Sequence, residues 1–271
     1  VGRLTTALSQ LNNVFAQKQG AVPHTILTTQ VKNDYDKVVM KVARVLNYVN
    51  RYQSKSALPS SLTEETTAAL THLVRMNCCR SMISQSTVEI LIHETVSALL
   101  NPSLICVPGM MVSMNKLAMR VVLSPSPIMS QMALINMQLA LISSFPDITS
   151  TTKNAYYDAK FSRVLKKLSQ KLSTYEGLDG LGLGDLFKLL YSIDRLIETV
   201  ENLLSQEGAS DEIDEILRPS KAMSKNLVLE LVRCKGVAVR EVVEVESRNI
   251  KCIEPILIEC EKILEMERRE R

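Results

Sequence analysis

The sequence contains no tryptophan, and aromatic residues make up only 4% of it. The apolar content, 46% of the chain, comes mainly from leucine, isoleucine, valine, methionine and alanine, and such aliphatic cores are typical of packed helices. Positive and negative charges nearly balance, with a formal net charge of +3. That excess is too small to require a nucleic-acid or acidic-membrane partner. With mean hydropathy near zero, the composition indicates a folded soluble protein rather than a disordered one.

Cysteine pairs with metal-ligand spacing are also lacking. None of the six cysteines forms a C-x-x-C pair, which excludes the spacing of a zinc ribbon. The first residues show no basic segment followed by an apolar one, so we expect no signal peptide and a cytoplasmic protein. We therefore expect the cysteines to be reduced thiols buried in the core. They are Cys78, Cys79, Cys106, Cys234, Cys252 and Cys260.

One uncharged run, Val121–Pro146, is long enough on paper to cross a membrane. It is interrupted by "SPSP" and carries Gln131, Asn136 and Gln138. A helix buried on most sides of a soluble core fits this pattern better than a membrane span. The two Ser-Pro dipeptides, at Ser124 and Ser126, fit a turn between helices and proline-directed phosphorylation equally well.

Apolar residues recur at helical spacing along nearly the whole chain, and no strand–helix alternation interrupts them. The pattern predicts an all-α protein. Breaks come about every 20 residues, so paired helices give units of about 40 residues, the period of HEAT or armadillo repeats. We expect a HEAT-like helical-repeat solenoid of about ten to twelve helices. Residues 1–271 would form a single domain, with a possible sub-boundary near 177–184.

Local signals predict several helix ends. Ser86 followed by Glu89 has the pattern of a capping box. Asp185 and Pro219 are expected to begin helices, and Gly236 to follow the end of one. The β-branched run "VAVREVVEVE" favours a strand by propensity, but no partner strand is predicted, so we expect a helix there.

The stretch "YEGLDGLGLGDLFKLL", from Tyr175 to Leu190, holds four of the nine glycines. A phosphate-binding loop would need a buried strand before the glycines and a helix after them. Here an amphipathic helix precedes them, and the spacing matches neither G-x-G-x-x-G nor the P-loop motif. We therefore predict a joint between two helices, with Gly177 capping the first of them.

The three histidines are scattered, and "HETVS" at His93 lacks the second histidine of a zinc-protease motif. No Ser/His/Asp arrangement or paired-carboxylate motif can be picked out. We therefore expect no enzymatic activity, no cofactor and no metal site.

One helix, expected from Asn154 to Thr174, carries a concentrated positive charge opposite an apolar stripe. This charged side could meet an acidic partner or nucleic acid, or it could be an ordinary solvated surface. Aromatic residues that could stack on bases are not interleaved with it, so nucleic acid is the less favoured partner. The candidate partner-binding residues are Lys160, Arg163, Lys166, Lys167 and Lys171.

Four stretches resemble, in the same order, the region after the TOG array in the Minispindles/ch-TOG family of microtubule polymerases. They are "MNKLAMRVVLSPSPIMSQMALINMQLAL", "AKFSRVLKKLSQKL", "PSKAMSKNLVLELVRCKG" and "CEKILEMERRER". The resemblance covers about Ser86 to Arg271 and depends on order and spacing more than on any single motif.

The resemblance implies a helical, TOG-like C-terminal domain that recruits the polymerase to spindle poles, centrosomes or microtubule plus ends through adaptors. The implied partners are TACC-type coiled coils and γ-tubulin complexes. The tubulin-binding TOG domains of the family carry a tryptophan in their first inter-helix loop, and its absence here argues against ordinary αβ-tubulin binding. A general helical scaffold in an RNA or trafficking complex is the alternative.

Overall fold

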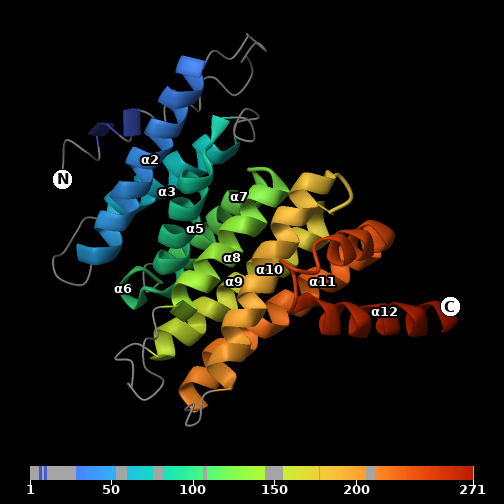
Figure 1. Cartoon of the computed structure of the whole chain (residues 1–271). Coiled ribbons are helices and arrows are strands. Elements are labelled where there is room, and N and C mark those ends of the chain that lie inside the picture. Colours follow the sequence, from blue (N-terminus) through green and yellow to red (C-terminus); the bar gives the residue numbers. More distant parts are fainter. Residues whose placement is uncertain are drawn as a thin grey trace. The chain divides into compact units, whose positions relative to one another are not determined.

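A computed structural model describes residues 6–7, 9–10, 29–52, 60–75, 82–105, 109–143, 155–176, 178–205 and 211–270. Within these ranges the chain forms ten helices and no strand, which confirms the all-α prediction (Figure 1). The chain divides into two compact units after Ser126, inside "SPSP". Residues 178–184, where we placed a possible sub-boundary, belong to the second unit and lie at the junction of α9 and α10.

The first unit consists of two helix pairs. Helices α2 and α3 form the first pair, α5 and α7 form the second, and the short α6 lies between α5 and α7. α2 packs against α3 and α5, while α7 packs against α5 and α3, so like members of the two pairs contact each other. The bounds are α2 Thr29–Tyr52, α3 Ser60–Arg75, α5 Gln85–Leu100, α6 Pro102–Ile105 and α7 Met110–Leu123.

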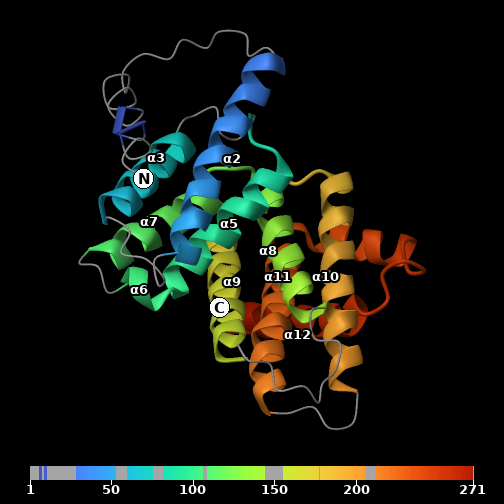
Figure 2. The same ribbon diagram turned by 90° about the vertical axis from the view of Figure 1, so that its left-hand side faces the viewer.

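The second unit repeats this arrangement and adds one helix. α8 packs against α9 and α10, α11 packs against α10 and α9, and α12 crosses α11 (Figure 2). Stacked helix pairs of this kind are the building principle of helical-repeat proteins. A continuous solenoid through both units stays a prediction. The bounds are α8 Pro127–Ser143, α9 Ala155–Glu176, α10 Leu183–Leu204, α11 Asp211–Val245 and α12 Ile253–Arg269.

The uncharged run that could have crossed a membrane is divided between α7 and α8. In α8 the exposed residues are Ala140 and Ser143, and the others are buried or half-buried. This agrees with the expected helix buried on most sides. Among the residues that the structure describes, no helix has both the length and the apolar character needed to cross a bilayer.

Several predicted helix ends are wrong. α5 is capped by Ser84, whose Oγ accepts a hydrogen bond from Thr87 N at 3.3 Å, and not by Ser86. In α10 the N-cap is Gly182, and Asp185 lies in the first turn. These errors are shifts of two or three residues, because several small polar residues compete for the same end.

Helix α11 departs further from the prediction. It begins at Asp211, so Pro219 lies inside the helix and does not start it. The backbone leaves helical geometry at Lys235, with φ −137° and ψ 28°, and then continues as helix to Val245, as expected for the β-branched run. Gly236 directly follows this break in the helix, as expected, but its φ is not positive.

The glycine stretch joins α9 to α10, as predicted. Gly180, Gly182 and Gly184 all have ordinary backbone angles, and a Cβ added to any of them would meet nothing within 4 Å. Gly177, the predicted cap, lies outside the described residues. Within the described part of the chain, the glycine with positive φ is Gly109, the N-cap of α7, at 74°.

Candidate functional site

The inner side of α9 fixes the helix in the second unit. The predicted apolar stripe is buried at Phe161, Leu165, Leu168 and Leu172, as expected from its spacing, and half-buried at Val164. Burying such a side chain stabilises the fold by about 1.5–3 kcal/mol. This apolar side therefore determines which residues of α9 face outward.

Serines on the same inner side form a buried polar seam that the sequence did not predict. Gln131 of α8 donates through Nε2 to Ser173 Oγ at 2.9 Å, and Ser169 Oγ donates to Gln131 Oε1 at 2.9 Å. Both serines and the glutamine are almost completely buried. Buried amides cost free energy unless they are hydrogen-bonded, so these contacts favour a single register between α8 and α9.

A second buried contact extends the seam to α11. Gln138, one heptad after Gln131 on α8, donates to Ser162 Oγ at 2.6 Å and to Ser220 Oγ at 2.7 Å. Ser162 in turn donates to the carbonyl oxygen of Ile216 at 2.9 Å. Three helices are thus tied together through one glutamine, which orients α9 and the cations on its outer side.

The five candidate cations all lie on α9, but they are not equally available. Lys160 places its ammonium 4.1 Å from the ring centre of Tyr156. Arg163 forms an ion pair with Glu215 of α11 at 2.8 Å. Lys167 and Lys171 are exposed, and Lys166 is half-buried. Within the described part of the chain, no ion pair is formed by these four lysines.

Three cations between α11 and α12 are different, because each is paired with a carboxylate. Lys225 meets Glu259 at 2.6 Å, and Arg240 is paired with Glu261. Arg233 contacts both Glu230 at 2.5 Å and Glu267 at 3.0 Å. The charges of these three cations are therefore neutralised internally, whereas the four lysines of α9 form no ion pair with a described residue.

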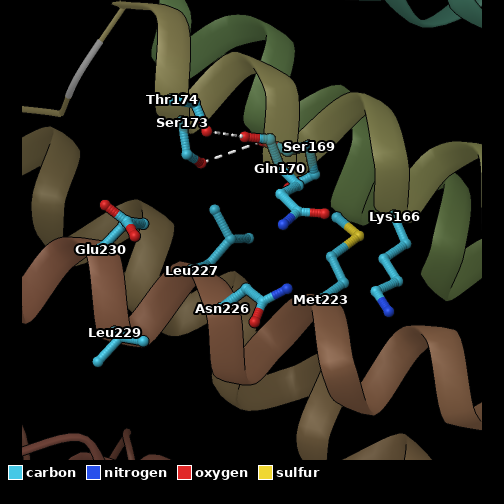
Figure 3. A pocket seen from close by; sticks show the side chains of 10 residues that line it. All are labelled: Lys166, Ser169, Gln170, Ser173, Thr174, Met223, Asn226, Leu227, Leu229 and Glu230. Carbon is cyan, nitrogen blue, oxygen red and sulfur yellow. Dashed lines mark hydrogen bonds between the residues drawn. The ribbon is translucent and has the colours of Figure 1, made fainter. Parts of the chain in front are cut away.

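A small pocket lies between α9 and α11, beside the cations (Figure 3). Its volume is about 200 Å³. Lys166 stands on one side and Glu230 on the other, and Gln170 and Leu227 lie between them. A lysine, a carboxylate and an amide around an apolar side chain can hold one polar or amphipathic side chain of a partner. The described residues contain no cluster of His, Cys, Asp or Glu able to hold a metal ion.

The cysteine prediction is only partly right. Of the three cysteines that the structure describes, Cys260 is buried, Cys252 is half-buried and Cys234 is exposed. Burial raises the pKa of the Cys260 thiol to about 11, so this thiol stays protonated at neutral pH. Cys234 lies next to Lys235, where the backbone of α11 departs from helical geometry.

Two acidic residues that the sequence did not single out connect helices, and of these Asp194 is buried and Asp36 half-buried. Asp194 of α10 accepts hydrogen bonds from Cys252 N at 2.6 Å and Ile253 N at 2.9 Å, and so caps the start of α12. Asp36 of α2 accepts from Ser84 N at 2.9 Å at the start of α5. A carboxylate at a helix start satisfies free N–H groups and complements the helix dipole. Only their position in the fold reveals this role.

A third acidic residue, Glu94, is buried between α5 and α2. Its Oε1 accepts from Asn47 Nδ2 at 2.7 Å and lies 3.0 Å from His93 Nδ1. Burial acts to raise its pKa, but the hydrogen bonds with His93 and Asn47 outweigh burial, and the pKa is lowered. His93 therefore has a structural role here, as a hydrogen-bond partner of Glu94.

Comparison with known protein families, curated proteins and solved structures gave no match.

Proposed function

We propose that this chain is a non-enzymatic protein-interaction domain that recruits a microtubule polymerase to spindle poles or microtubule ends through adaptor proteins. The observation that carries the proposal is the contrast in pairing. Exposed Lys167 and Lys171 of α9 have no carboxylate partner among the described residues, whereas the cations between α11 and α12 do. The order of the stretches that resemble the Minispindles/ch-TOG family supports the link to microtubules.

The adaptor that fits this surface best is an acidic coiled coil of the TACC type, with a γ-tubulin complex as a further partner. A coiled coil presents rows of carboxylates at helical spacing, and Lys160, Lys167 and Lys171 repeat at similar spacing along α9. Attraction between exposed charges raises the association rate more than the affinity, and salt screens it over about 8 Å at physiological ionic strength. We therefore expect fast, salt-sensitive association, with apolar contacts supplying much of the affinity.

The test is charge reversal of two exposed lysines, Lys167→Glu with Lys171→Glu. The matched control is Lys251→Glu with Lys262→Glu, which changes the net charge equally at two other exposed positions of the second unit. Association with a purified TACC coiled coil and with a γ-tubulin complex is measured at low and physiological salt. We expect the association rate to fall about tenfold or more for the α9 variant at low salt.

Equal rates for the α9 variant and the control would overturn the proposal. Single-stranded RNA is the comparison ligand, because the exposed Tyr156 ring beside Lys160 is able to stack on a base. RNA binding that is lost in Tyr156→Ala, together with no binding to either adaptor, would favour a scaffold in an RNA complex instead. Circular dichroism establishes that each variant keeps its helical content.

A further inference from the structure

The first unit has a groove in the same structural position as the α9–α11 pocket of the second unit. It lies between α3 and α7, which are the second members of their helix pairs, as α9 and α11 are. Its volume is about 270 Å³. The two grooves are equivalent in their position within each unit.

The walls of this groove combine small residues with two cations. Ala68 of α3, the methyl group of Thr67 and Met110 of α7, which is 3% exposed, supply the apolar part of the lining. Lys116 and Arg120 lie one turn apart on α7 and line the same groove. Neither forms an ion pair with any residue that the structure describes.

The two grooves also share their chemistry. Each has a methionine, Met110 or Met223, and each has several hydroxyl residues in its lining. Each has a lysine, Lys116 or Lys166, and one carboxylate. The groove in the first unit is the more positive of the two linings, since it has Arg120 in addition.

We propose that the α3–α7 groove is a second docking site, and that its ligand is an acidic helical peptide segment. An aliphatic side chain of the segment enters above Met110, and carboxylates one turn apart pair with Lys116 and Arg120. The spacing of the two cations matches that of carboxylates at positions i and i+4 of a helix. No residue of α9 takes part, so this site goes beyond the function proposed above and stands or falls separately.

The lining favours a peptide over a nucleic acid. The lining contains no Phe, Tyr or Trp, and its aromatic ring is the imidazole of His72, so the groove lacks the row of aromatic side chains on which successive bases stack. Its two cations are accompanied by the carboxylate of Glu64, which repels phosphates, and nucleic-acid binding depends on neutralising many phosphates at once. The small apolar part of the lining suits one aliphatic side chain.

The experiment uses the whole chain with ¹³C-labelled methionine methyl groups, so that Met110 reports on the α3–α7 groove and Met223 on the α9–α11 pocket. The probe is a synthetic helical peptide of leucine, alanine and glutamate. The matched probe has glutamine in place of every glutamate. We expect a saturable shift of the Met110 signal with the glutamate peptide, and an apparent affinity at least about tenfold weaker with the glutamine peptide.

Two variants test the cations. Lys116→Glu with Arg120→Glu should abolish the Met110 shift, whereas Lys251→Glu with Lys262→Glu should leave it unchanged. Ser113→Glu, at an exposed position on the rim, adds one repelling carboxylate without removing any side chain that packs, and should weaken the shift at least severalfold.

The proposal fails if Met110 does not respond, if both peptides bind equally, or if single-stranded RNA shifts Met110 and the peptide does not. Lys167→Glu with Lys171→Glu should leave the Met110 response intact. A Met110 response with no effect of the α9 variant on adaptor binding would support this site while refuting the function proposed for α9.

Discussion

Helix α9 and the surface between α11 and α12 both carry cations, but these cations differ in their pairing with carboxylates. On α11 and α12, Lys225 and Arg240 each meet a carboxylate of the neighbouring helix. On α9, Arg163 alone of the five candidates has such a partner among the described residues. Charge density along the sequence is therefore a poor guide to an available charged surface, because pairing depends on which helix lies next to it. Substitutions in each region should separate the contribution of apolar packing from that of charge pairing.

The largest effect is expected from the apolar side of α9. Leu168→Ala should destabilise the protein by about 2–5 kcal/mol, because it leaves a cavity in a packed core. Lys167→Ala, its neighbour on the outer side, should change the unfolding free energy by less than about 0.5 kcal/mol. Urea unfolding followed by circular dichroism measures both. A neutral Leu168→Ala would show that the two sides of α9 are not divided as described.

The buried thiol of Cys260 should make the α11–α12 region sensitive to alkaline pH. Its pKa is raised from 9.0 to about 11 by burial, so the unfolded chain loses this proton first. The stabilising contribution is complete below about pH 9 and is lost as the pH rises through 11, by at most about 2–3 kcal/mol. Unfolding of wild type and Cys260→Ala at several pH values in this window gives the difference. Parallel pH profiles would contradict the prediction.

The cap on α12 should matter more than any one ion pair. Asp194→Ala removes the acceptor of two backbone N–H groups and should cost about 0.5–2 kcal/mol. Asp194→Asn keeps an acceptor oxygen and should recover part of the loss. Hydrogen exchange of the amides at the start of α12 is the direct measurement. Unchanged protection in Asp194→Ala would mean that packing alone holds this end.

The smallest effect is expected from the ion pairs themselves. A double-mutant cycle of Arg240→Ala and Glu261→Ala should give a coupling free energy of about 0.2–1 kcal/mol, because both side chains remain partly exposed. Added salt should reduce it. The same cycle with Lys167→Ala and Glu261→Ala serves as the unpaired reference and should give no coupling free energy. A coupling as large as the Leu168→Ala effect would mean that charge pairs dominate the packing of α12.

The helices themselves could be predicted because their signal is repeated many times along the chain. The apolar stripe of α9 has several members, so one misjudged residue does not change the outcome. Helix ends depend on one or two residues, and there the prediction failed, as at Ser86 and Asp185. The prediction for Pro219 was also wrong, because the helical pattern on both sides of this proline outweighs the free-energy cost of placing it inside a helix.

The candidate site could be predicted only in part. The five cations of α9 follow from the sequence, but their availability does not, because Arg163 is paired with Glu215, a residue far along the chain. The pocket beside Lys166 needs α11, and the α3–α7 groove needs two helices separated by the whole of α5. No periodic pattern within one helix reports which other helix packs against it.

The sequence by itself determined the all-α class, the helical runs and the side of α9 that is buried. These follow from the periodic spacing of apolar residues, which each segment carries alone. Only the tertiary structure decided that Gln131 and Gln138 are buried donors, that Asp194 caps α12, and which cations are neutralised. A hydrogen bond or an ion pair needs two groups within about 3–4 Å, and that distance is set by how separate helices pack.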